Sequence, residues 1–288
     1  MLGELYRPSG KALEHAQAVL EIDDVYAVNV AYGCSMGCSY CYGPKSTYQS
    51  RESWHEIRYP KEKSLDLVRR QLEKGLRPEG VFISFLTEPL LPGVRDSTEE
   101  LAWFLVDQGI RVAVSSKSGI ALVAGVRHGM TVVSMDPEFT RRFEGSNPEP
   151  RMRVETLSVM HDSGEYTWAS LEPLPCPEIW QQDVLELLRE LQFVDFLILG
   201  KWNYDRRADT PEAREYYRSA VSTFRDFCVE HGIRHHVKTD TLRFIGGHSE
   251  FLPTSNHPPV TPSGNKSKNE VGKNSLCPPM NLRVSVLT

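Results

Sequence analysis

The feature that most constrains this chain is a regular alternation of short apolar runs with longer amphipathic segments between about residues 25 and 240. The apolar runs are continuous rather than alternating, which is typical of strands buried on both faces. Strands that alternate with helices pair in parallel, because each return to the same edge of the sheet needs a crossover connection. The pattern therefore predicts a parallel sheet with helices outside it.

The expected elements follow from these runs and from their capping residues. We expect strands at 25–31, 81–86, 110–115, 131–135, 166–172, 193–199 and 233–239. We expect helices at 97–109, 150–163, 177–191 and 211–231. The helix at 97–109 has a capping box, Ser97 with Glu100, and a glycine stop, and the helix at 177–191 has a proline at its start.

About six strand–helix units, rather than eight, indicate an α/β fold of the incomplete, TIM-like (β/α)6 barrel type that is open on one side. We divide the chain into a short N-terminal extension (1–24), the barrel domain (25–245) and an irregular tail (246–288). The tail is rich in Pro, Ser, Asn and Lys and poor in periodic apolar residues, so we expect it to be disordered.

Composition limits the cellular compartments and the binding partners that we expect for this protein. The formal net charge is −5 and no dense Lys/Arg block is present, so the sequence does not indicate nucleic-acid binding. No run reaches membrane-spanning length and no signal peptide is evident, so we expect no membrane contact. Three of the six cysteines crowd into one loop and the others are scattered, which is no disulfide framework and favours a reducing cytoplasm.

The crowded cysteines are Cys34, Cys38 and Cys41, with C-x3-C-x2-C spacing, directly after the first predicted strand. Four thiolates saturate a four-iron cluster, whereas three leave one iron free to bind another ligand. A closed zinc site needs a fourth Cys or His nearby, and the first histidine downstream is His55. The residues alone leave three interpretations open: an iron–sulfur cluster, half of a zinc knuckle, or structural thiols.

The carboxyl ends of parallel strands meet at one rim, where α/β barrels carry their functional groups. Polar residues follow the predicted strands at these ends: Thr87 and Glu88, Lys117, Ser134, Glu172, and Asn203. Trp202 and Tyr204 lie beside Asn203 and could form a substrate wall. We expect the adjacent His235 and His236 not to share a metal, because neighbouring residues on a strand point to opposite faces.

The cysteine spacing, with the aromatic Tyr40 before the third cysteine, resembles the radical S-adenosylmethionine (SAM) superfamily. The resemblance implies one [4Fe–4S] cluster on the three cysteines and a SAM molecule whose amine and carboxylate bind the fourth iron. It also implies reductive cleavage of SAM to a 5′-deoxyadenosyl radical, which abstracts hydrogen from a substrate. The protein's task is then to bind and orient the cofactors.

The elements Ser116-Lys117-Ser118 and Arg153-Val154-Glu155 look like the spore-photoproduct-lyase-like branch of that superfamily. The resemblance implies that Tyr40 lies against the adenine, that Lys117 contacts the SAM carboxylate, that Ser134 contacts the ribose and that Arg153 braces the site. The acid of Thr87-Glu88 matches the element for the SAM amino group, and Glu172 and Asn203 could hold SAM or substrate. The candidate cofactor residues are Tyr40, Thr87, Glu88, Lys117, Ser134, Arg153, Glu172 and Asn203, and the metal ligands are Cys34, Cys38 and Cys41.

The chain departs from the branch in one respect, because residues 81–89 contain no cysteine to serve as a hydrogen donor. We therefore do not expect thymine-dimer repair. Cys176 follows the fifth predicted strand and is the one remaining cysteine that could act as a radical relay. We expect a monomer that receives electrons from a carrier such as flavodoxin or ferredoxin.

Two alternative functions stay open. A nucleic-acid lesion- or base-modifying enzyme of the photoproduct-lyase type would bind DNA or RNA in a salt-sensitive way. A non-catalytic iron–sulfur or zinc module would bind metal without cleaving SAM.

Overall fold

The computed structural model of this chain describes residues 2–246. The predicted tail (246–288) lies outside the described residues except for Gly246. The division into 1–24, 25–245 and 246–288 stays a prediction.

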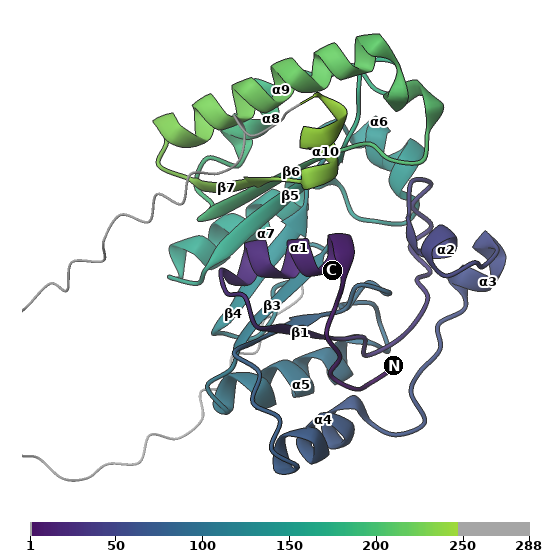
Figure 1. Ribbon diagram of the computed structural model, residues 1–288, viewed down its shortest axis with the longest axis vertical. Coiled ribbons are helices and arrows are strands. Elements are labelled where there is room, and N and C mark those ends of the chain that lie inside the picture. The colour runs from purple at the N-terminus through teal and green to yellow at the C-terminus, as the bar shows by residue number, and fades with distance from the viewer. Residues whose placement is uncertain (1, 247–288) are drawn as a thin grey trace, which may run out of the picture. The chain divides into compact units, whose positions relative to one another are not determined.

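A seven-stranded sheet forms the centre of the molecule, with its strands in sequence order and every neighbouring pair parallel. The sheet curls into part of a barrel with helices around its outside (Figure 1). The strands are β1 (Val25–Val28), β2 (Gly80–Ile83), β3 (Arg111–Ser116), β4 (Val126–Thr131), β5 (Thr167–Leu174), β6 (Phe196–Lys201) and β7 (Arg234–Val237). The incomplete parallel barrel predicted from the alternation is therefore confirmed.

Helices cover the outer face and occupy the connections. The α-helices are α1 (Gly10–Leu20), α2 (Gly43–Ser46), α3 (Arg51–His55), α4 (Ser64–Glu73), α5 (Arg95–Asp107), α6 (Pro137–Phe139), α7 (Pro150–Asp162), α8 (Val184–Glu190), α9 (Pro211–Glu230) and α10 (Thr239–Phe244). A π-helical turn, η1 (Thr140–Glu144), follows α6, and a 3-10 turn, η2 (Arg206–Asp209), precedes α9.

The fourth strand differs from its prediction. It runs over Val126–Thr131 rather than 131–135, although Val132 and Val133 just beyond it are buried. This segment contains polar residues and a glycine, so a search for continuous apolar runs does not find it. His128 is fully buried and accepts a hydrogen bond from the amide of Leu122, and Gly129 leaves room for Trp168, whose ring would lie 1.9 Å from an added Cβ.

The helix predicted over 177–191 is also shorter than expected. Only Val184–Glu190 is helical, and it begins at the N-cap Asp183, whose side chain accepts from the amide of Leu185. Asp is a strong N-cap residue because its carboxylate satisfies an amide that has no partner within the helix. The proline at 177 instead stands in an irregular segment after β5.

The N-terminal helix α1 packs inside the curl of the sheet (Figure 1). Its buried residues form one cluster with strand residues that point to the concave face: Ala16, Val19 and Leu20 with Phe82, Ala113, Trp168, Phe196 and Ile198. Strand residues between them, such as Val81 and Val112, belong instead to the core beneath the outer helices. The segment expected to be a short extension thus fills part of the barrel interior.

Candidate active site

A cavity of about 600 Å³ opens at the carboxyl ends of the strands. The loop after β1 covers one side of it, the ends of β2, β3 and β5 form its floor, and α1 closes the opposite side. This is the rim at which the sequence placed the functional residues. Six of the eight predicted cofactor residues line it, together with all three cysteines: Tyr40, Thr87, Glu88, Lys117, Glu172, Asn203, Cys34, Cys38 and Cys41.

The cysteine loop is held from both sides by backbone contacts. The amide of Cys34 donates to the carbonyl of Trp54 (2.9 Å), and the amide of Ser39 donates to the carbonyl of Phe143 (2.8 Å). Gly145 has a φ of 63° and lies so close to the loop that an added Cβ would stand 2.1 Å from the carbonyl oxygen of Met36. Only glycine combines that conformation with that approach, so Gly145 fixes the loop against the segment after η1.

Burial raises the pKa of the Cys34 thiol, and it raises the pKa of the Cys38 thiol to about 12. Both thiols are therefore protonated at neutral pH in the absence of metal. A metal centre binds the thiolate and displaces this proton. The amide nitrogen of Asn147 lies 3.1 Å from the sulfur of Cys38 and can donate to it. Such hydrogen bonds to ligand sulfurs are one means by which proteins tune iron–sulfur clusters.

The chemistry of the donor set can be compared with the two kinds of metal site. A closed zinc site takes four Cys or His ligands. A four-iron cluster held by three thiolates keeps one iron open for another ligand. Cys34, Cys38 and Cys41 line one cavity, so the donors present fit a three-thiolate cluster.

Glu88 is the most firmly held side chain at the rim. One carboxylate oxygen accepts from the hydroxyl of Ser116 (2.6 Å) and the other from the amide of Lys117 (2.9 Å). Burial nevertheless raises the pKa of Glu88 above its usual value. A buried carboxylate in this position is suited to bind a cationic group, which would supply the missing positive charge. Glu88, which the resemblance assigned to the SAM amino group by its position in the sequence, is thus held in one defined orientation.

Four polar atoms of residues that line the cavity have no hydrogen-bond partner within residues 2–246. They are the hydroxyls of Ser84 and Thr87, the amide oxygen of Asn147 and the indole nitrogen of Trp54, all of them buried. Buried polar atoms are normally satisfied, and each exception calls for a partner. Ser84 also has a φ of 68°, an uncommon conformation for a residue other than glycine that is often found at functional sites. These atoms indicate a polar ligand in the cavity.

Tyr40 is tied to a buried ion pair behind the loop. Its hydroxyl donates to Glu144, whose carboxylate also pairs with Arg153. Burial by itself would raise the pKa of Glu144, but the Arg153 guanidinium, Lys117 and the Tyr40 hydroxyl together outweigh burial and lower it, so the carboxyl of Glu144 is ionised. The ammonium of Lys117 lies 5.7 Å from the centre of the Tyr40 ring. This network sets the position of Tyr40 between the cysteines and the rim.

Ser134 and Arg153 do not line the cavity. The Ser134 hydroxyl accepts from the amide of Asp136 (3.2 Å) and is buried behind the end of β4. Arg153 donates to the carbonyl of Thr131 (3.0 Å) as well as to Glu144, and through Glu144 it is connected to Tyr40. Their roles toward a cofactor stay predictions.

The side of the cavity formed by α1 was not predicted from the sequence. Lys11 and His15 of α1 line it together with Glu172 and Lys238. His15 stands 3.8 Å from the Glu172 carboxylate, and burial holds the pKa of His15 well below its usual value. A sequence signal that could have found this side is the helical spacing of Leu13, Ala16, Val19 and Leu20, which indicates a buried helix face but not the strand ends that it contacts.

The remaining expected residues lie near the same rim. Asn203 lines the cavity and donates to Asp240 (3.2 Å). Trp202 is buried and packs edge-on against Tyr40, whereas Tyr204 is 56% exposed. Cys176 is buried, lies close to the carbonyl of Arg207 and does not line the cavity, so its position gives no support to a radical relay.

The incomplete parallel barrel is a fold that this chain shares with several solved structures. One solved structure with the same fold is spore photoproduct lyase complexed with dinucleoside spore photoproduct, at 16% identity and a TM-score of 0.54 over 74% of this chain and 76% of that chain. Another is a double mutant of the same lyase with bound AdoMet and dinucleoside spore photoproduct, at 15% identity and a TM-score of 0.54 over 81% and 86%.

A third similar structure is SuiB of Streptococcus suis, at 10% identity and a TM-score of 0.52; the match covers 74% of this chain and 48% of SuiB. At such identities the similarity establishes the shared fold alone. No family model matches the sequence, and neither does any curated protein. None of the helices in residues 2–246 has the length and apolarity needed to cross a bilayer.

Proposed function

We propose that this protein is a radical SAM enzyme that binds one [4Fe–4S] cluster through Cys34, Cys38 and Cys41. The observation that carries the proposal is the single cavity that these thiols share with Glu88 and Lys117 at the carboxyl ends of parallel strands. A protein that only carries metal does not need a cavity lined by a buried acid and by polar atoms without hydrogen-bond partners. When bound, the cluster supplies an electron to SAM and so generates the 5′-deoxyadenosyl radical that abstracts hydrogen from the substrate.

The chain's own residues bind and orient the cofactor in this proposal. Glu88, buried and fixed by three hydrogen bonds, accepts from the ammonium of SAM. Lys117 comes directly after the neighbouring strand β3 and supplies a compact cation for the carboxylate of SAM. Tyr40 covers the adenine, and the hydroxyls of Thr87 and Ser84 donate hydrogen bonds to the cofactor. Glu172 and Asn203, on the opposite side, contact the substrate.

The cellular setting follows from the same chemistry. An oxygen-sensitive cluster on reduced thiols requires a reducing compartment, so we place the enzyme in the cytoplasm. A one-electron carrier such as flavodoxin or ferredoxin would reduce the cluster. We infer that the protein acts as a monomer, because one chain supplies every group that the cofactor needs.

Anaerobic reconstitution tests the proposal directly. The protein should turn brown and bind about four irons through its three loop cysteines. Dithionite together with SAM should then yield 5′-deoxyadenosine, measured by liquid chromatography. A protein that binds zinc, stays colourless and leaves SAM intact would instead be the non-catalytic module.

A further inference from the structure

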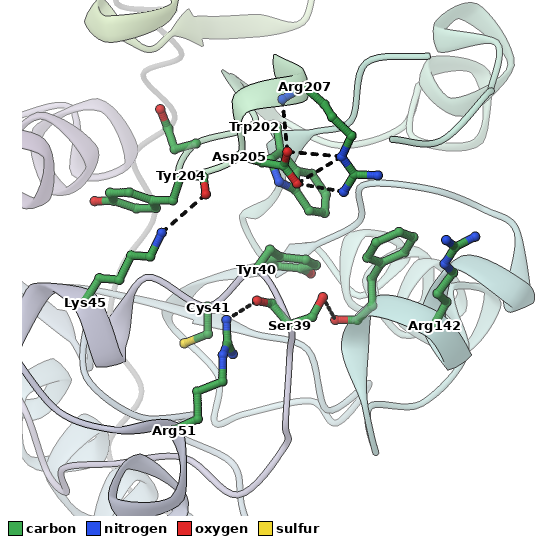
Figure 2. A pocket seen from close by; sticks show the side chains of 12 residues that line it. Ser39, Tyr40, Cys41, Lys45, Arg51, Arg142, Trp202, Tyr204, Asp205 and Arg207 are labelled. Atoms are coloured by element: carbon green, nitrogen blue, oxygen red, sulfur yellow. Dashed lines mark hydrogen bonds and ion pairs between the residues drawn. The ribbon is translucent and has the colours of Figure 1, made fainter. Parts of the chain in front are cut away.

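A second, smaller cavity of about 320 Å³ lies on the other side of the cysteine loop (Figure 2). It is an open cleft between the loop, α3, η1 and the segment that follows β6. Four of its lining residues also line the larger cavity: Tyr40, Cys41, Asn203 and Tyr204. A molecule held in this cleft therefore lies against the wall of the proposed cofactor site.

The cleft is strongly basic. Its ionisable side chains, cysteine and tyrosine aside, are Lys45, Arg51, Arg142, Arg207 and Asp205. Four cations thus face one acid, in a chain that has 38 acidic and 33 basic residues overall. Charge of one sign gathered in a cleft attracts ligands of the opposite sign.

The four cations differ in what already binds them. Arg207 pairs with Asp205, and the ammonium of Lys45 donates to the carbonyl of Tyr204 (3.3 Å) (Figure 2). Arg51 donates to the backbone carbonyls of Cys38 and Ser39. Arg142 lies 5.3 Å from the centre of the Phe143 ring, and none of the ion pairs found within residues 2–246 includes it. An arginine has five N–H donors, so each guanidinium keeps donors for a ligand.

We propose that this cleft binds a phosphate group of the substrate, an inference that rests on the proposed function and names the substrate class for it. Guanidinium groups match phosphate with paired hydrogen bonds. A phosphate monoester carries about −1.5 to −2 charges at pH 7, which suits the excess of positive charge better than a single carboxylate. With its phosphate in the cleft, the substrate extends past Tyr204 and Asn203 toward the larger cavity.

Binding of defined probes to the anaerobically reconstituted protein tests the proposal by isothermal titration calorimetry. The probes are inorganic pyrophosphate, a ten-residue oligothymidylate, and succinate as a carboxylate of similar size. We expect pyrophosphate to bind, and we expect Arg142→Gln to weaken its binding at least tenfold. Arg151→Gln is the matched control, because Arg151 is an exposed arginine on α7 that pairs with Glu190 away from the cleft.

The outcomes separate the sources of phosphate. Tighter binding of the oligothymidylate than of pyrophosphate, lost in Arg142→Gln, supports the cleft and assigns it to a nucleic-acid substrate. Binding of pyrophosphate alone supports a small phosphate ester. Succinate binding as tightly as pyrophosphate, or phosphate binding that Arg142→Gln leaves unchanged, overturns the proposal. SAM cleavage by the wild-type protein with dithionite and no probe tests the proposed function separately.

Discussion

Two glutamates face the large cavity from opposite sides, and the protein holds them in different ways. Glu88 accepts hydrogen bonds from Ser116 and from the amides of Lys117 and Leu90. Among residues 2–246, Glu172 accepts no such hydrogen bonds; His15 lies 3.8 Å from its carboxylate, and the charges of Lys238 and Lys11 favour its ionised form. Burial raises the pKa of both carboxyls. The first is prearranged by neighbouring strand ends, whereas the second depends on α1, which is distant in sequence.

The difference extends to the two sides of the cavity. The side with the cysteine loop and Glu88 is built from strand ends and their loops, and its groups are aimed at the cavity. The side with α1 is joined to the end of the sheet by side-chain contacts, such as Glu14 with His236 and Lys11 with Asp240. We infer that the first side binds the cofactor and the second mainly closes the barrel. Variants on each side should therefore affect different properties.

The largest effect is expected on the cofactor side, from Cys38→Ala. Loss of one thiolate should abolish stable cluster binding and lower 5′-deoxyadenosine formation by more than about a hundredfold, since the cluster cannot be held by two ligands. Iron content and the product would both be measured. Cys228→Ala, which removes a buried thiol on α9 outside the cavity, should keep both. Equal iron in the two variants would contradict the ligand assignment.

The next effect is on stability behind the loop, where Glu144 and Arg153 are each 1% exposed. Arg153→Met should lower the free energy of unfolding by about 3–5 kcal/mol, because it leaves a buried carboxylate without its partner. Urea unfolding measures it. Arg151→Met removes the exposed pair with Glu190 and should cost less than about 1 kcal/mol. Similar losses in both variants would show that burial of the pair is not the cause.

Glu88→Gln should weaken SAM binding about 10- to 100-fold, because a hydrogen bond to a charged group contributes about 1.5–3 kcal/mol. Its effect on unfolding should be smaller than that of Arg153→Met, since the amide oxygen can still accept from Ser116 and Leu90 and only the bond from the amide of Lys117 is lost. Equilibrium binding of SAM to the reconstituted protein measures it, with Glu100→Gln on the exposed part of α5 as the control. If Glu88→Gln instead destabilises the fold and leaves the SAM affinity unchanged, the inference that this side of the cavity binds the cofactor is wrong.

The smallest effect is expected on the closing side, from Glu14→Gln. Burial opposes ionisation of Glu14, but bonds from His236, Lys238 and Thr239 lower its pKa below the usual 4.5. An acid with a lowered pKa in the folded state stabilises above its unfolded pKa, and that contribution is lost as the pH falls through the folded value. The variant should therefore lose about 1–2 kcal/mol at pH 7.

The difference between wild type and Glu14→Gln should shrink as the pH drops below about 4.5, the ordinary pKa of the group. Urea unfolding at several pH values would measure it. Glu73→Gln, at an exposed position of α4, should show no such pH dependence. A loss that stays constant from pH 7 to acid pH would mean that packing, not the charge of Glu14, joins α1 to the end of the sheet.

The sequence by itself determined the parallel barrel and the contents of its rim. Continuous apolar runs alternating with amphipathic segments permit only a covered parallel sheet, and parallel strands bring their carboxyl ends together. For that reason Glu88, Lys117 and the cysteines could be assigned to one site. The fourth strand was misplaced because its buried histidine and glycine do not follow the apolar pattern.

Only the tertiary structure decided that α1 lines the large cavity and that Ser134 and Arg153 do not. It also decided that four basic side chains line the cleft beside the cysteine loop. An amphipathic helix shows that one face will be buried, but not against which partner. Glu14 contacts His236 across 222 residues of sequence, and Arg51, Arg142 and Arg207 line one cleft although they come from separate segments of the chain. Local periodicity carries no information about such meetings, because they depend on how the whole sheet curls.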